Sequence, residues 1–363
     1  MYLFYRQEKS LFLLAISALL LTACGGGGGG EGGGNRPEPE VWLISTQFIV
    51  DGGPGKDGIP ALQNPAFESA TTISTVDPDD LVIALRSEGQ VKVYPHDVMM
   101  YHEIINDGPD DAPFTMSYCP LTGSGVAWLG DLDHADPTFG VSGLLYNSNL
   151  LLYDRETGSH WSQMLQKSVR GPRIREIPTS VQLIETTFST ITAMYPDAIV
   201  MTRDTGWGRS YDDYPYGDYL TSQDLLFDVS QQNNSLPRKQ LAIGIYNGEN
   251  AKVYQLSGFG AQTQTIHDQF ASQSIVVVGN TALNFAAIYD RELSDGTILS
   301  FTPIQGDLPN VMTDTEGNVW DVFGVAVSGP RAGTQLASTK SYTAMWFAWA
   351  AFFNQTEIYF SRS

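Results

Sequence analysis

An internal repeat constrains this chain more than any other feature of its sequence. The stretch LVIALRSEGQVKVYP, residues 81–95, recurs as LAIGIYNGENAKVYQ, residues 241–255. Further on, DRETGSHW, residues 154–161, is echoed by DTEGNVW, residues 314–320. The offset between the copies changes only from 160 to 159 residues. Because a chance match would not keep register over such a length, we expect a duplicated structural unit.

The repeat sets the expected organisation of the chain. We place the first copy at residues 57–204, the second copy at residues 236–363, and a connection rich in Asp, Tyr, Gly, Ser and Asn at residues 205–235. The copies are preceded by a signal peptide, residues 1–23, and by a tether, residues 24–42. We expect the first copy to carry the functional site and the second to serve as a scaffold.

Each copy is expected to be one hairpin-helix-strands-helix-strand unit. Apolar and β-branched residues flank the turn pairs Glu88-Gly89 and Gly248-Glu249, which predicts a hairpin at the start of each copy. Helices are expected at residues 95–106, 187–195 and 342–353, the first with a proline at its start. Strands are expected at residues 114–118, 125–129, 139–146, 150–154, 198–202 and 356–360. The predicted fold class is therefore α+β, strand-rich, with two pseudo-symmetric copies.

The N-terminus has the layout of an export signal. Arg6 and Lys9 precede an uncharged apolar run at residues 11–21, which is too short to span a bilayer. The run leads into Leu21-Thr22-Ala23-Cys24, which resembles the lipobox of bacterial lipoproteins. We expect Cys24 to carry a lipid that holds the protein on a membrane, with a glycine-rich tether after it. The expected location is extracytoplasmic, at the outer membrane in a Gram-negative cell; the alternative is an ordinary signal peptide.

Charge and cysteine content limit the classes of function. The formal net charge of −20 and the lack of a Lys/Arg cluster exclude nucleic acid as a partner. Cys119 is the one cysteine besides Cys24, so a lipidated chain has no partner for an intrachain disulfide.

Several motifs of the first copy occur together in a known family. They are DGIPAL (57–62), YHEIIND (101–107), YCPLTGS (118–124), FGVSGLLYNSNLLLYDRETGSHWSQ (139–163), GP (171–172) and YPD (195–197). In this order they resemble the bacterial family catalogued as domain of unknown function 3179. The resemblance implies an extracytoplasmic, often lipid-anchored protein and brings no established reaction. Many relatives have a Cys-x-x-Cys where this chain has Thr122 as the fourth residue, so a dithiol cycle within one chain is not expected.

Cys119 and His102 are the candidate residues for chemistry. At helical spacing His102 shares an inward face with Val98 and Ile105, while Glu103 is expected to point away. Cys119 follows an apolar strand, where a docked helix could bring imidazole to thiol. The pair could hold copper or zinc, with Met164 or His160 as a third ligand. The second copy has Thr263 or a neighbour, and Gly279 or Asn280, at these places, as expected of a single site.

Two alternatives to a metal or small-ligand site remain. Cys119 could act as a nucleophile with His102 as its base, which would make the protein a thiol-dependent enzyme. The body could instead be an adhesion or assembly module in which Cys119 is only a buried residue. Whether the protein is an enzyme is left open. A polar ligand pocket is expected to be lined by Asn147, Asp154, Arg155 and Gln163 from the densest motif.

Overall fold

The computed structural model describes residues 41–360, and this part of the chain is mostly β-structure. Six sheets, mostly antiparallel, contain nearly all of its regular elements. The three α-helices have seven residues each: α1 (His96–His102), α2 (Phe188–Met194) and α3 (Trp346–Phe352). The predicted α+β class is therefore wrong, and the fold is a mostly β fold. The signal peptide, Cys24 and most of the tether lie outside the described residues.

The error arises where expected helices give way to strands. The helix expected at residues 95–106 ends at His102, because Glu103 takes a positive φ of 57° and Ile104 begins a strand. The first residues of the helix expected at residues 342–353 belong instead to a strand that ends at Met345, and the helix begins at Trp346. Ile104-Ile105 is a pair of β-branched residues, which favours a strand. Among the described residues, no helix is long and apolar enough to cross a membrane.

Both expected hairpins are present, and each adds a parallel strand. In the first, β4 (Leu81–Ser87) and β5 (Gln90–Pro95) are joined by Glu88-Gly89 with φ values of 50° and 80°. Two successive positive φ values are what a tight two-residue hairpin turn requires. The second hairpin consists of β16 (Leu241–Asn247) and β17 (Asn250–Gln255). Later strands pair in parallel with β5 and β17 and close each unit: β15 (Ile199–Met201) and β26 (Gln355–Ile358).

The remaining strands form the other sheets and sheet edges. The first hairpin sheet has the order β14-β4-β5-β15-β3 and the second β25-β16-β17-β26, with β3 (Phe67–Ser69), β14 (Ile184–Thr187) and β25 (Ser341–Met345). A second pair of sheets has the orders β13-β8-β7-β6-β2 and β18-β19-β20. Their strands are β2 (Leu62–Gln63), β6 (Ile104–Asp107), β7 (Phe114–Cys119), β8 (Ser124–Leu129), β13 (Ser180–Val181), β18 (Gln264–Phe270), β19 (Gln273–Asn280) and β20 (Phe285–Asp290).

A third pair of sheets has the orders β1-β9-β10-β11-β12 and β21-β22-β23-β24. Its strands are β1 (Ile49–Asp51), β9 (Phe139–Tyr146), β10 (Asn149–Asp154), β11 (His160–Ser162), β12 (Lys167–Arg170), β21 (Phe301–Pro303), β22 (Asn310–Asp314), β23 (Val319–Asp321) and β24 (Ala326–Ser328). Two 3-10 turns complete the set: η1 (Thr46–Phe48) and η2 (Leu256–Gly258). The halves thus share one succession of sheets, and η2 stands where the first half has α1; the exact boundaries of the copies stay a prediction.

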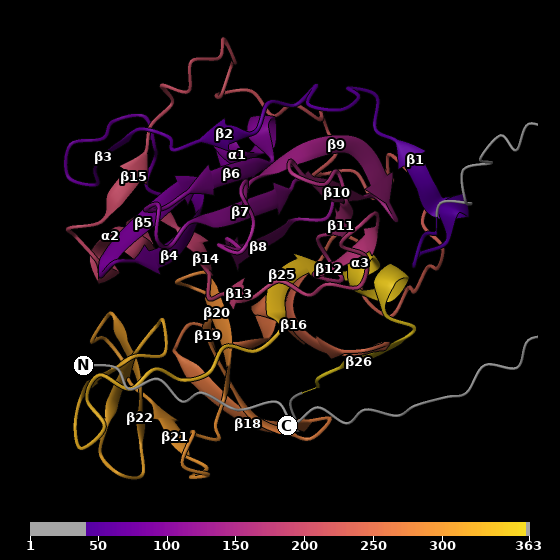
Figure 1. Cartoon of the computed structure of the whole chain (residues 1–363). Helices are drawn as coiled ribbons and strands as arrows, with labels where there is room; N and C mark the ends of the chain where they lie inside the picture. Colours follow the sequence, from indigo (N-terminus) through magenta and orange to yellow (C-terminus); the bar gives the residue numbers. More distant parts are fainter. Residues whose placement is uncertain (1–40, 361–363) are drawn as a thin grey trace, which may run out of the picture. The chain divides into compact units, whose positions relative to one another are not determined.

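The two halves complete each other's cores. One core cluster joins Trp346 and Trp349 of α3 to Trp128 and Trp161 of the first half. Figure 1 shows α3, in yellow, in the region of the magenta strand β11, which contains Trp161 of this cluster. A second cluster joins Ile191 of α2 and the first hairpin sheet to strands of the second half. Neither half therefore buries its apolar surface alone, and the described residues, 41–360, belong to one compact unit.

Replacement of Trp349 tests this mutual packing. Its ring is fully buried and stacks on Tyr342 at 4.6 Å, and its indole N–H donates to the carbonyl of Ala242. We expect Trp349→Ala to lower the free energy of unfolding by about 3–5 kcal/mol. Trp207, which is 52% exposed, is the control, and Trp207→Ala should change stability by less than about 0.5 kcal/mol. Equal stabilities of the two variants in urea unfolding would contradict the packing described here.

Candidate active site and ligand cavity

Cys119 ends β7 and is almost completely buried, with 1% of its surface exposed. Its Sγ lies 3.8 Å from the carbonyl oxygen of Ser148, to which the thiol donates. Burial and the nearby Glu103 carboxylate raise the pKa of the thiol to about 11. The hydroxyl of Thr122 and the N–H groups of Thr122 and Leu150 oppose this rise but do not outweigh it. Cys119 is therefore a protonated thiol at neutral pH.

His102 is the last residue of α1, and both of its ring nitrogens have hydrogen-bond partners other than Cys119. Nδ1 lies 2.7 Å from the carbonyl oxygen of Pro60, and Nε2 lies 2.7 Å from the hydroxyl of Tyr211. Because a carbonyl only accepts, Nδ1 carries the proton and Nε2 accepts from Tyr211. Burial lowers the pKa of His102, which keeps the ring neutral. Both nitrogens are thus engaged, and the structure does not bring His102 to Cys119 as the sequence suggested.

Glu103 takes the place next to Cys119 that was expected for His102. The expectation that Glu103 points away from the core is wrong, because only 5% of its surface is exposed. Its backbone has a φ of 57° and a ψ of −33°, a conformation that non-glycine residues rarely adopt. The carbonyl of Glu103 accepts the N–H of Tyr118 at 2.8 Å, which ties the end of α1 to β7. This backbone conformation turns the side chain of Glu103 inward. Strained backbone conformations of this kind are common at functional sites.

The Glu103 side chain faces an apolar cavity of about 190 Å³. The lining residues come from the loop before β2, from the end of α1, from the β7–β8 turn, from β9 and β10 and from the connection: Gly52, Pro54, Ile59, Glu103, Leu121, Val141, Gly143, Leu144, Leu145, Leu150, Tyr216 and Phe227. The hydroxyl of Tyr216 donates to Oε1 of Glu103 at 3.4 Å, a long hydrogen bond. Burial raises the pKa of Glu103 to about 7, and the Tyr216 hydroxyl opposes this rise. The cavity thus ends on a carboxyl group that changes charge near neutral pH.

Tyrosines of the connection cover this region. Tyr219 is buried and donates its hydroxyl to the carbonyl of Leu121 at 2.8 Å. The rings of Tyr214 and Tyr216 lie 5.7 Å apart, and the buried hydroxyl of Tyr214 has no hydrogen-bond partner among the described residues. Burial and the charge of a Cys119 thiolate raise the pKa of Tyr214 to about 12. The segment expected to be a plain connection is therefore part of the site.

Gln163 has a structural role, and its amide has no free hydrogen-bonding group for a ligand. It is fully buried, and its Oε1 accepts from the Ser124 hydroxyl and from Asn149 Nδ2, both at 2.7 Å. Its Nε2 donates to the carbonyls of Ser117 and Ser124 at 3.2 and 3.1 Å. All the capacity of the amide is used within the protein. The sequence analysis missed Asn149, which joins this network.

The other expected pocket residues also have structural roles. Asn147 is buried and links the two halves, since its Nδ2 donates to Ala351 at 3.2 Å and its Oδ1 accepts the N–H of Ser230. Arg155 lies 3.3 Å from Asp57 in a partly exposed ion pair. Neither residue lines the cavity.

Asp154 holds Trp161 by a contact that recurs in the second half. The indole N–H of Trp161 donates to Asp154 at 3.0 Å, and that of Trp320 donates to Asp314 at 2.8 Å. A contact present in both halves serves the common fold rather than a single site. Asp154 therefore belongs to the scaffold.

The site lacks a counterpart in the second half. In the strand register, Asn280 is paired with Phe285 across a turn, as Cys119 is paired with Ser124 in the first half. The Nδ2 of Asn280 donates to the Thr263 hydroxyl at 3.3 Å. An amide and a hydroxyl thus stand where the first half has thiol and imidazole.

The expected third metal ligands lie in different surroundings. Met164 is fully buried in the core cluster that contains Cys119. The half-buried ring of His160 packs at 5.4 Å from the ring of Trp42.

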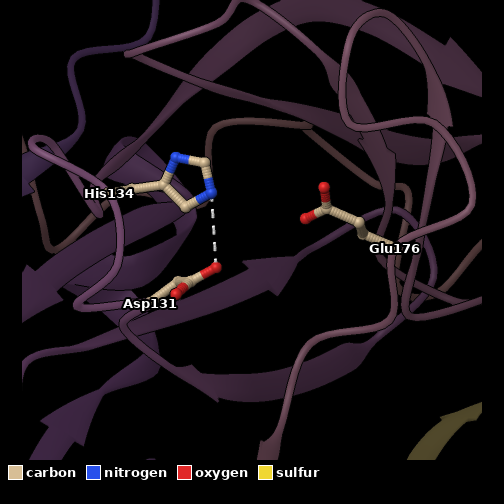
Figure 2. A group of neighbouring side chains, drawn as sticks. All are labelled: Asp131, His134 and Glu176. Atoms are coloured by element: carbon tan, nitrogen blue, oxygen red, sulfur yellow. Dashed lines mark ion pairs between the residues drawn. The ribbon is translucent and has the colours of Figure 1, made fainter. Parts of the chain in front are cut away.

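A second group with metal-ligand chemistry lies at the surface. Ligand atoms of Asp131, His134 and Glu176 lie within 4.8 Å of one another. Figure 2 shows the three side chains, with the ion pair between Asp131 and His134. Arg173 donates to both carboxylates, at 2.8 Å to Asp131 and 2.7 Å to Glu176, and His134 lies 2.9 Å from Glu156. A cation would have to displace this guanidinium. The group is therefore an ion-pair cluster.

The buried carboxyl should appear in the pH dependence of stability. The folded pKa of Glu103 is about 7 against an ordinary value of 4.5, so the folded state binds more protons between these values. The contribution of Glu103 to the free energy of unfolding is then fully present below about pH 4.5, and about 3 kcal/mol is lost as the pH rises from there through 7. In Glu103→Gln this loss should be absent. The free energy of unfolding of the variant relative to wild type, measured in urea, should therefore rise by that amount between pH 4.5 and pH 8. A difference independent of pH would contradict a buried, uncompensated Glu103.

Cys119 should react slowly with thiol reagents. A pKa raised from 9.0 to about 11 leaves about a hundredfold less thiolate at neutral pH, and burial adds a steric barrier. We expect labelling by a disulfide reagent to be more than about a hundredfold slower in the folded protein than in urea. Glu103→Gln should accelerate labelling at pH 9, because it removes the nearby negative charge. Rapid labelling of the folded wild type would contradict this assignment.

Comparison with known proteins gives one match. The profile of the family described as "Protein of unknown function (DUF3179)" matches residues 56–356. Searches of curated proteins and of solved structures returned no match. The matched region contains Cys119, Glu103, most of both halves of the fold and every lining residue of the cavity except Gly52 and Pro54, so the chain belongs to the DUF3179 family.

Proposed function

We propose that this protein is an exported, lipid-anchored binding protein that holds a small, largely apolar ligand in the cavity that ends on Glu103. The observation that carries the proposal is a 95%-buried carboxyl group at the end of an apolar cavity, with one long hydrogen bond as its contact. An apolar pocket with a few polar groups is the usual form of a small-molecule site. A carboxyl group in such a place costs stability unless a ligand completes its contacts.

The backbone around Glu103 supports the same proposal. A positive φ costs on the order of 1–3 kcal/mol in a non-glycine residue, and glycine would avoid that cost. Here the conformation directs a carboxyl group into the cavity instead. Tyr216 and Phe227 come from the connection, a segment without helix or strand, and could move to admit a ligand.

Export and anchoring rest on the N-terminal sequence. The charged start, the short apolar run and Cys24 support lipid attachment on the extracytoplasmic side, at the outer membrane of a Gram-negative cell. The glycine-rich tether would keep the binding body close to that surface.

The geometry gives less support to a copper or zinc site at Cys119 and His102. Both nitrogens of His102 are occupied, by Pro60 and Tyr211, so a metal would have to displace the partner of one nitrogen and break a short hydrogen bond. A thiol-dependent enzyme is also less well supported, because Glu103 rather than His102 lies near the thiol and raises its pKa. Burial of Cys119 and its raised pKa favour binding over catalysis. Adhesion or assembly has no specific contact in its favour.

Fluorescence titration with the neutral apolar dye N-phenyl-1-naphthylamine tests the proposed function. We expect saturable binding that weakens more than about tenfold in Leu144→Trp, where an indole fills part of the cavity. Ile298→Trp is the matched control, because Ile298 is 52% exposed in the second half, and its affinity should equal that of wild type. Thermal unfolding verifies that both variants are folded.

Two outcomes would contradict the proposal. One is dye binding that is absent, or that is equal in the two tryptophan variants. The other is stoichiometric copper or zinc in the purified protein that is lost in both Cys119→Ser and His102→Ala, which would establish the metal site instead.

A further inference from the structure

Glu103 differs from other buried carboxylates of this chain in its partners, because Asp154 and Asp314 each accept several hydrogen bonds, one of them from a tryptophan indole, and two others pair with cations. Asp107 pairs with Lys92 at 2.8 Å, and Asp321 pairs with Arg86 at 2.8 Å. Both are therefore compensated by a cation in the protein itself. Among the described residues, Glu103 takes part in no ion pair, and Tyr216 is its side-chain hydrogen-bond partner. The protein supplies a buried negative group and leaves its counter-charge to another molecule.

The rest of the cavity would accept a cation with an apolar tail. No Lys, Arg or His is among the described residues that line it, so an anionic head would have no partner there. Tyr216 and Phe227 lie at the wall, and aromatic faces attract ammonium groups. Leucine and valine side chains from β9 and β10 provide a surface for a hydrocarbon chain. The net charge of −20 would also concentrate cations near the protein.

We propose that the ligand of this cavity is an aliphatic amine, whose protonated nitrogen pairs with the Glu103 carboxylate while its alkyl chain lies along Val141, Leu145 and Leu150. This inference rests on the proposed function, since it names the chemical class of the ligand for the same cavity. An alkyl alcohol would gain the apolar contacts without the ion pair, and an alkyl carboxylate would meet the like charge of Glu103.

The affinity for an amine should depend on pH in a defined direction. Alkylamines stay protonated up to about pH 10, as lysine does. Glu103, with a pKa of about 7, must be ionised to form the pair, so affinity should fall about tenfold per unit below that pH. The groups that face Glu103 are Tyr216 and Cys119, and both stay uncharged over this range because their pKa values are raised. The change can therefore be assigned to Glu103.

Isothermal titration calorimetry of the purified protein with n-hexylamine, 1-hexanol and hexanoate at pH 8 tests the inference. We expect hexylamine to bind more than about tenfold more tightly than hexanol, and hexanoate not to bind. Glu103→Gln should remove the advantage of the amine and leave the affinity for hexanol within about threefold of wild type. In wild type, the amine affinity should fall between pH 8 and pH 5, which tests Glu103 without any substitution.

The outcomes separate this inference from the proposed function. Equal affinities for hexylamine and hexanol, unchanged in Glu103→Gln and independent of pH, would overturn the amine assignment while the cavity remained a binding site. Failure of all three compounds and of N-phenyl-1-naphthylamine to bind would overturn the proposed function and the inference with it.

Discussion

The exchange of apolar surfaces between the two halves supports everything else in this structure. α3, near the C-terminal end of the described chain, belongs to the same core cluster as Trp128 and Trp161 of the first half, and its Phe352 ring lies 5.3 Å from the ring of Tyr146. Asn147 adds a polar contact at the same junction through the carbonyl of Ala351. The wall formed by β9 and β10, which lines the ligand cavity, is therefore supported by residues about 200 positions later in the chain. The second half is needed for the shape of a site to which it contributes none of the lining residues.

The site itself depends on the backbone conformation of one residue, Glu103. At Glu103 the chain leaves α1 and enters β6 within a single residue, and the positive φ turns the carboxyl group into the interior. Neighbouring residues are fixed by complete hydrogen-bond networks, such as the one around Gln163. Glu103 has no such network. The contrast between side chains with complete hydrogen-bond networks and a carboxyl group with one long hydrogen bond separates structural from functional polar residues here, more clearly than the position of a residue within a motif.

Strand positions and hairpin turns could be predicted from the sequence, because they depend on local patterns. The strand at residues 139–146 has the bounds that were expected, and Glu88-Gly89 forms the expected turn. The helical prediction failed where a helical spacing was extended past the end of the helix. A spacing of 100° per residue placed Glu103 outside and Ile105 inside, but the helix ends at His102. The β-branched pair Ile104-Ile105 was the signal that a strand begins there.

What the sequence by itself determined is the repeat, the family and most strands. Which groups meet around Cys119 was decided only in the tertiary structure. The Tyr216 hydroxyl donates a hydrogen bond to Glu103, which lies 113 residues earlier in the chain. The Tyr211 hydroxyl is hydrogen-bonded to the imidazole of His102, which lies 109 residues earlier. Such contacts depend on how a segment without regular structure packs over the sheets. No local periodicity encodes that packing, because its energy comes from burial against distant parts of the chain.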